Sequence, residues 1–285
     1  MGTSSLYKGP KRTPLLPDDY NDNPNNPEGP IETPPEKSPE EEGNSKENNT
    51  NNPPNKTWGD AKRSMSRHIS GKSSFGIRKP ISDYVRTRGG AANATKTSRS
   101  AVRTTSNIIT FFGGIINSGV SKTFEKYHIT TEGKNSLEIL NEIVNNIAPV
   151  PVDREDAISR EALIETMSEI YASDQFDISS LDGFNAGALK QLVQTYVYRY
   201  IYAKIINDLG NTILTKGERK EDVIRIEEEI RVYIKNVVNT TIGGIDINNI
   251  LSTDKIQENV ATLYKHCYQV MEDQLRTILK NAEKE

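Results

Sequence analysis

The stretch LKQLVQTYVYRYIYAKI, residues 189–205, decides the fold class, because two secondary structures compete for it. Tyrosines alternate at positions 196, 198, 200 and 202, and alternation is typical of a strand. Over a longer window, however, apolar residues recur every three or four positions, which is the period of a helix. These residues are Leu189, Leu192, Val193, Tyr196, Val197, Tyr200, Ile201 and Ile205. The longer period predicts a helix over about 186–209 that ends at Gly210.

Similar apolar spacing predicts four more helices, two before this one and two after it. They cover about 136–147, 153–170, 219–239 and 253–282. We expect Asp153 or Asp156 to cap the second of them, and Ser252 or Thr253 to cap the last. The sequence therefore predicts an all-α fold, with a bundle of about five to seven helices over residues 107–285.

The first hundred residues differ in composition, and their charges are segregated. Residues 18–57 hold nothing apolar apart from Tyr20 and Ile31, which is too little to offset roughly 1–2 kcal/mol of ordering entropy per residue. We therefore expect an acidic, Asn/Pro-rich disordered linker there, preceded by a short tail over residues 1–17. Residues 58–106 are basic and rich in Ser, Gly and Ala, and we expect them to order at most on binding a partner.

The sequence offers few residues for catalysis or metal binding. The three histidines are not spaced as ligand pairs, and His266 and Cys267 are helix neighbours that point in different directions. No glycine-rich phosphate loop of the Walker or Rossmann type is present. We therefore expect a protein that is not an enzyme and that binds no metal or cofactor.

The same features predict a cytoplasmic protein with no membrane segment. A single cysteine fits a reducing compartment. Residues 1–20 have no apolar core of the kind found in signal peptides. The most apolar run, Ile108–Val120, is shorter than the roughly 20 residues that a membrane span needs.

The basic segment is a candidate nucleic-acid contact. Between Lys56 and Arg103 there are twelve basic residues against two acidic ones, and cations of this kind can neutralise phosphates and release counterions. An acidic protein partner, or the acidic linker of the same chain, could occupy the segment instead. The candidate contacts are Lys62, Arg63, Arg67, Lys72, Arg78, Lys79, Arg86, Arg88, Arg99 and Arg103.

The N-terminus carries the clearest candidate for chemical modification. Gly2 is small enough to allow removal of Met1, which would leave a free α-amino group. Its pKa of about 7.8, against about 10.4 for lysine, makes it the better acylation target at neutral pH. Myristoylation is an alternative, but that signal requires Ser or Thr at the position of Leu6.

Three motifs occur in a characteristic order along the first half of the chain. The first is Met1-Gly2-Thr3-Ser4-Ser5, followed by Tyr7, Gly9-Pro10 and Thr13-Pro14-Leu15-Leu16-Pro17. The second is Trp58 followed by Ala61-Lys62. The third runs from Tyr84-Val85-Arg86 through Gly89-Gly90-Ala91-Ala92 to Ser98-Arg99-Ser100-Ala101-Val102. In this order they resemble the QatB proteins of bacterial Qat anti-phage systems, although Lys8, Lys11, Arg12 and Asn/Pro-rich sequence replace part of the usual glycine-rich, acidic stretch.

The resemblance implies partners and a chemical role. QatB-like proteins are encoded with an ATPase (QatA type), a QueC-like enzyme (QatC type) and a TatD-like nuclease (QatD type). QueC enzymes activate a 7-deazaguanine carboxylate with ATP, and in defence relatives of QueC the N-terminal glycine of a protein can be the nitrogen nucleophile. The resemblance thus implies a covalent 7-deazaguanine adduct at Gly2. It also implies that the QueC-like enzyme binds the tail residues Thr3, Ser4, Ser5, Tyr7, Gly9, Pro10, Thr13, Pro14, Leu15, Leu16 and Pro17.

Three functions remain open on the sequence. The first is the acceptor role at Gly2. The second is a nucleic-acid adaptor that delivers DNA to the nuclease through residues 56–103. The third is an assembly scaffold that carries no modification.

Overall fold

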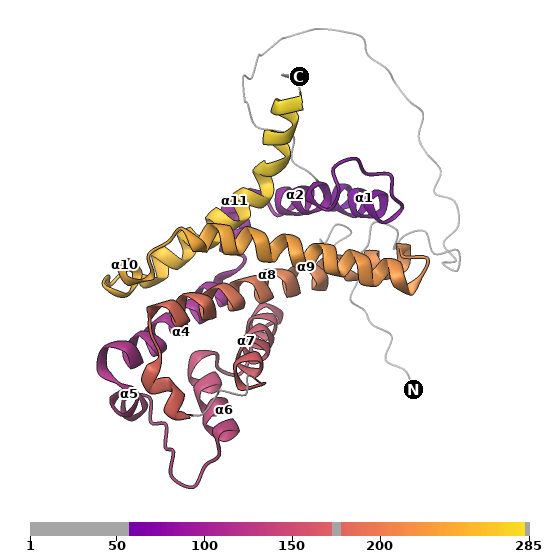
Figure 1. The fold of residues 1–285 in the computed structure, drawn as a ribbon. Coiled ribbons are helices and arrows are strands. Elements are labelled where there is room, and N and C mark those ends of the chain that lie inside the picture. Colours follow the sequence, from indigo (N-terminus) through magenta and orange to yellow (C-terminus); the bar gives the residue numbers. More distant parts are fainter. Residues whose placement is uncertain (1–56, 173–177, 283–285) are drawn as a thin grey trace, which may run out of the picture. The chain divides into compact units, whose positions relative to one another are not determined.

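The computed structural model describes residues 57–172 and 178–282, and every regular element in these ranges is helical (Figure 1). The tail predicted over 1–17, and the linker predicted over 18–57 apart from Thr57, lie outside the described residues. The elements are α1 Trp58–Ile69, α2 Arg78–Thr87, α3 Gly90–Lys96, α4 Arg99–Ser118, α5 Val120–Lys126, α6 Ser136–Ile147, α7 Arg154–Ala172, the 3-10 helix η1 Ile178–Gly183, α8 Ala186–Lys216, α9 Lys220–Gly243, α10 Ile247–Leu251 and α11 Ile256–Ala282.

The all-α prediction is confirmed, and the tyrosine-rich stretch lies within α8. Tyr196 and Tyr200 are fully buried, whereas Tyr198 and Tyr202 are half-buried at the edge of the core. This division follows the helical period and not the alternation of the tyrosines. The predicted stop at Gly210 is wrong, because α8 continues to Lys216. The buried Ile213 holds this last part against the core, and such packing outweighs the roughly 1 kcal/mol that glycine costs within a helix.

The helix α8 lies at the centre of the fold and contacts α1, α4, α7 and α9. The last helix, α11, packs against α2, α3, α4 and α9. In Figure 1, α1 and α2 lie together beside the pair formed by α8 and α9. The two long helices α8 and α11 therefore form the platform on which the N-terminal helices rest.

Residues 58–106, which we expected to order at most on binding a partner, are helical in this structure. They form α1, α2, α3 and the first part of α4. Ala61 and Met65 in α1, and Ile81 and Val85 in α2, are fully buried in the core. Each pair is separated by four residues, so the apolar residues of each helix share one face. The other faces of these helices carry many charged residues, so the composition of the segment as a whole did not reveal the apolar face.

Local signals fix the starts of several helices. The Asp60 carboxylate accepts hydrogen bonds from the Thr57 backbone N–H and hydroxyl, both at 2.8 Å, at the start of α1. Asp153 accepts from the Asp156 backbone N–H at 2.8 Å, as predicted for the cap of α7. The last helix begins at Ile256, later than predicted, because Ser252 ends the short helix α10.

No helix in the described ranges combines the length and the apolar character that a membrane span requires. Ile108 and Phe111, from the most apolar run of the sequence, are instead buried in the core through α4. The same ranges hold no group of three His, Cys, Asp or Glu side chains placed to bind a metal ion.

Candidate functional site

The residues predicted to meet the QueC-like partner, Gly2 and the tail from Thr3 to Pro17, lie outside the described residues. The candidate site that the structure describes is therefore built from the predicted basic contacts. Nine of them lie in α1, α2, the loop between these helices, or the start of α4, and Arg88 directly follows α2.

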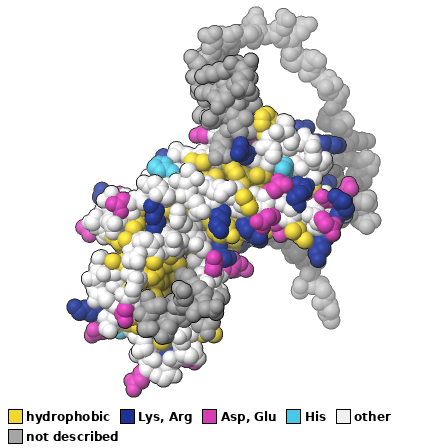
Figure 2. All heavy atoms as spheres, viewed as in Figure 1, with side chains coloured by type: hydrophobic (Ala, Val, Ile, Leu, Met, Phe, Trp, Pro, Cys, Tyr) yellow, Lys and Arg dark blue, Asp and Glu magenta, His cyan; other side chains and the backbone are white. Residues whose placement is uncertain are grey.

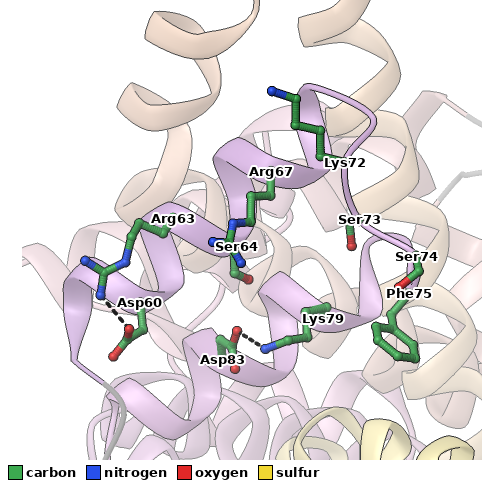
Figure 3. Close-up of a pocket in the computed structure, with 10 residues that line it drawn as sticks. All are labelled: Asp60, Arg63, Ser64, Arg67, Lys72, Ser73, Ser74, Phe75, Lys79 and Asp83. Atoms are coloured by element: carbon green, nitrogen blue, oxygen red, sulfur yellow. Dashed lines mark hydrogen bonds and ion pairs between the residues drawn. The ribbon is translucent and has the colours of Figure 1, made fainter.

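A cavity between α1, α2 and their connecting loop gathers four of these ten residues (Figure 3). Arg63 and Arg67 come from one side of α1, Lys72 from the loop, and Lys79 from the start of α2. The cavity has a volume of about 370 Å³. Its lining is completed by Asp60, Ser64, Ser73, Ser74, Phe75 and Asp83. We refer to it as the α1–α2 cavity.

Two of the four cations of the α1–α2 cavity are paired with acids. Arg63 contacts Asp60 at 2.6 Å, and Lys79 contacts Asp83 at 2.5 Å. The hydrogen bond from Arg63 lowers the pKa of Asp60, so this carboxylate is ionised at neutral pH. Arg67 and Lys72 form no ion pair with any described residue. Four cations against two carboxylates leave the cavity with an excess of positive charge.

A buried hydroxyl also faces this cavity. The side chain of Ser64 is 9% exposed, and its Oγ makes no hydrogen bond with any described residue. A serine within a helix often donates to the carbonyl four residues earlier, as Ser66 does to Lys62 at 2.9 Å. A buried polar atom without a partner costs about 1–3 kcal/mol. Ser64 is thus a donor that is available to a group entering the cavity.

Two of the ten basic residues are anchored within the fold. Arg88 pairs with the Asp208 carboxylate in α8, and its guanidinium lies 5.4 Å from the centre of the Tyr84 ring. Tyr84 Oη donates to the same carboxylate at 2.8 Å. Arg86 donates to the Glu272 carbonyl in α11 at 3.2 Å. These side chains hold α2 against α8 and α11 and contribute little to an external surface.

The remaining four basic residues are dispersed. Arg99 and Arg103 contact Asp153 and Asp156 at 3.5 Å and 2.8 Å. Arg78 lines a separate, mostly apolar cavity, and Lys62 is exposed on α1. On the face shown in Figure 2, Lys and Arg side chains are mixed with Asp and Glu. The ten predicted contacts are therefore divided among separate places in the fold.

A buried network around Lys204 in α8 was not expected from the sequence. Its ammonium group donates to the Thr97 carbonyl at 2.7 Å, to Glu155 at 2.7 Å and to Tyr200 Oη at 2.9 Å. Burial lowers the pKa of Lys204, although Glu155 opposes this shift. All three N–H donors have acceptors, so the group ties α8 to α7 and to the segment before α4. The signal available in the sequence was the position of this lysine. It lies four residues after Tyr200, on the apolar face of the predicted helix, where a charged residue needs partners.

The comparison with protein families identifies the chain's relatives. A family model described as "Qat anti-phage system associated protein QatB" matches residues 89–271, which is more than half of the 285 residues. The chain belongs to the QatB family. The matched range begins at Gly89, within the third of the three sequence motifs, and ends in α11. Comparisons with curated proteins and with solved structures gave no match.

Within the QatB match, the motif residues are structural. The Ala91 backbone N–H donates to the Glu272 carboxylate at 2.9 Å, which attaches the start of α3 to α11. The Ser98 hydroxyl is 2.9 Å from Tyr268 Oη, and Ser100 donates to Asp156 at 2.6 Å. These contacts join the motif to α11 and α7, so its small residues reflect close packing of helices.

Proposed function

We propose that this member of the QatB family is a non-enzymatic component of anti-phage defence whose Gly2 amine becomes joined to a 7-deazaguanine base. Membership of the QatB family gives the defence role. The finer proposal rests on one observation, the opening Met1-Gly2-Thr3-Ser4-Ser5 with its following Pro-containing motifs. In this proposal a QueC-like enzyme binds Thr3 to Pro17 and performs the chemistry.

The proposed reaction is an amide condensation. The enzyme joins the 7-deazaguanine carboxylate to the AMP part of ATP as an acyl-phosphate anhydride, and pyrophosphate leaves. The neutral Gly2 amine attacks the carbonyl carbon, the C–N bond forms, and the activated oxygen leaves with the nucleotide. The amine loses one proton in the same step. Glycine suits this role because its α-amino pKa is near 7.8 and no side chain obstructs the approach.

The helical body would recognise the partner and keep the tail close to it. When one site is already bound, a tethered second site reaches its target at a high effective concentration, which depends on the length of the linker. The packed domain over α1 to α11 can supply the first contact, and the polar sequence between Pro17 and Trp58 can supply the tether. The ATPase and the nuclease of the same system are further proposed partners.

The test is the intact mass of the chain after co-expression with its QueC-like neighbour. We expect a mass increase equal to the deazaguanine carboxylic acid less one water. A Gly2→Pro variant should lack the increase, because its amine is secondary and hindered. Lys8→Gln is the matched control, since it removes the nearest side-chain amine. An adduct lost in Lys8→Gln but kept in Gly2→Pro would overturn the proposal.

The nucleic-acid adaptor has weaker support. Five of its ten predicted contacts are ion-paired with carboxylates of the same chain: Arg63, Lys79, Arg88, Arg99 and Arg103. Paired cations release fewer counterions on binding phosphates, so they contribute less to affinity. A steep loss of DNA binding with added salt, removed by changing these residues, would favour the adaptor instead. An unmodified chain without DNA binding, required for assembly of the other components, would favour the scaffold.

A further inference from the structure

The α1–α2 cavity has walls formed by two packed helices, and some of its cations have no ion-pair partner among the described residues. One wall is a single side of α1. Arg63 and Ser64 lie three and four residues after Asp60, and Arg67 lies four and three residues after them. The opposite wall is the first part of α2, with Lys79 and Asp83. Both helices are held by buried residues, so the walls do not depend on a ligand to form.

The free positive charge lies between two ion pairs. Arg63 and Lys79 are each held by an acid, whereas Arg67 has no ion-pair partner among the described residues. In Figure 3 the Arg67 side chain runs back along α1 toward Ser64. Residues three apart on a helix are neighbours, so the guanidinium and the hydroxyl can contact one bound group. Lys72 adds a second unpaired cation at the rim.

The buried hydroxyl of Ser64 is independent evidence for a ligand. It is more than nine-tenths buried, it lines the cavity, and it has no hydrogen-bond partner among the described residues. Buried polar atoms are rarely left in this state, and a missing partner is a common reason. A donor hydroxyl beside an unpaired guanidinium matches an anion with several oxygens.

We propose that the α1–α2 cavity binds a small phosphate ester of the size of a nucleoside monophosphate. The phosphate would lie against Arg67 and Ser64, since guanidinium forks and hydroxyl donors suit phosphate oxygens. A volume of about 370 Å³ is within the range of small-ligand sites. Phe75, which is half-buried in the lining, offers an aromatic face for a base. This site is separate from the Gly2 proposal and does not depend on it.

The two acids of the cavity argue for a small ligand and against a polymer. A nucleic-acid strand would bring successive phosphates along the groove, past the ionised carboxylates of Asp60 and Asp83. The negative phosphates and carboxylates would repel one another within the cavity. One phosphate at Arg67 avoids this conflict, because it contacts the unpaired cation and does not have to pass the two carboxylates.

The experiment is calorimetric titration of the full chain with AMP, GMP, CMP, UMP and inorganic pyrophosphate. We expect at least one of these probes to bind, and the corresponding nucleoside without phosphate to bind at least about tenfold more weakly. Arg67→Gln should weaken binding about tenfold, and Lys62→Gln, an exposed position on the same helix outside the cavity, should leave it unchanged. Absence of binding by every probe would overturn the proposal.

Ser64→Ala provides a second readout that separates binding from folding. It removes a buried hydroxyl without a partner, so the ligand-free variant should keep or raise its Tm. The same variant should bind the phosphate probe about three- to tenfold more weakly. A lower Tm with unchanged affinity would contradict a ligand role for the hydroxyl. Stronger binding of longer oligo-dT, weakened equally by Arg67→Gln and Lys62→Gln, would assign the surface to nucleic acid and overturn the proposal.

Discussion

At Gly90 the backbone φ is +78°, and a Cβ there would lie 3.3 Å from a carboxylate oxygen of Glu272. Gly133 has a similar φ of +73° but open space around it. Left-handed backbone costs an L-residue about 1–2 kcal/mol, so we expect Gly133→Ala to lower the free energy of unfolding by about that amount. Gly90→Ala should cost more, because Glu272 must also move. Equal costs in urea unfolding would contradict a close contact between α3 and α11.

Cys267 makes stability depend on pH. Burial raises the pKa of its thiol from 9.0 to about 12. The folded state therefore keeps a proton that the unfolded state loses, and stability falls as the pH rises from about 9 to about 12. The slope from this group is at most about 1.4 kcal/mol per pH unit. We expect the unfolding free energy of Cys267→Ala to fall less steeply across this window than that of the unchanged chain.

The comparison of two proteins isolates the thiol from other titrating groups. Burial raises the pKa of Tyr264, which also lowers stability at high pH. Burial lowers the pKa of Lys204, so the unfolded state binds more protons there and stability rises as the pH increases toward its ordinary value. Both groups are present in both proteins, so the part of their effect that comes from burial cancels in the difference. Parallel pH profiles would show that the thiol is not buried in solution.

The N-terminal helices give the most direct test of the fold at the scale of elements. Met65 in α1 is fully buried, and Met65→Ala should lower the unfolding free energy by about 2–4 kcal/mol. Val152, at 92% exposure, is the control, and Val152→Ala should change stability by less than about 0.5 kcal/mol. If residues 58–106 ordered only on binding a partner, Met65→Ala would be as neutral as the control in the isolated chain.

The helices differ in how far the sequence predicts them. For α6 and α8 the apolar period was sufficient to predict a helix. The predicted range of α6 agrees with the structure, whereas α8 extends beyond its predicted end. For α1 and α2 the apolar residues are few and include Ala61, so charge and small-residue content suggested an unordered segment. Packing on α8 and α11 supplies the missing stability, and one sequence gives no direct sign of such long-range contacts.

The candidate site was predictable in part. The basic residue types were identified from charge alone, but their grouping depends on helices that the sequence did not predict. With α1 known, the spacing of Asp60, Ser64 and Arg67 would have placed these residues on one side. The ion pairs of Arg99 and Arg103 join segments more than fifty residues apart in sequence. Contacts at that separation do not follow from local patterns.

For the whole molecule, the proposed separation between a leading segment that reacts and a helical body that folds predicts the effect of a truncation. Apart from prolines, residues 1–52 hold seven apolar side chains, so their removal deletes little apolar surface: Met1, Leu6, Tyr7, Leu15, Leu16, Tyr20 and Ile31. We expect a chain that begins at Pro53 to keep the Tm of the full chain within about 2 °C. It should also lose the proposed adduct and its defence activity. A large drop in Tm would show that the leading segment stabilises the helical body.

The central claim is an amide bond between the Gly2 amine and a 7-deazaguanine base. Tandem mass spectrometry of the N-terminal tryptic peptide tests it most directly. Cleavage after Lys8 releases the peptide that begins at Gly2. From cells that also express the QueC-like partner, we predict that the smallest N-terminal fragment ions carry the deazaguanine mass, and that they lose it when the partner is omitted. An unmodified Gly2 in the presence of an active partner would contradict the account. So would the added mass on Lys8, which would block cleavage there and appear in a longer peptide that ends at Lys11.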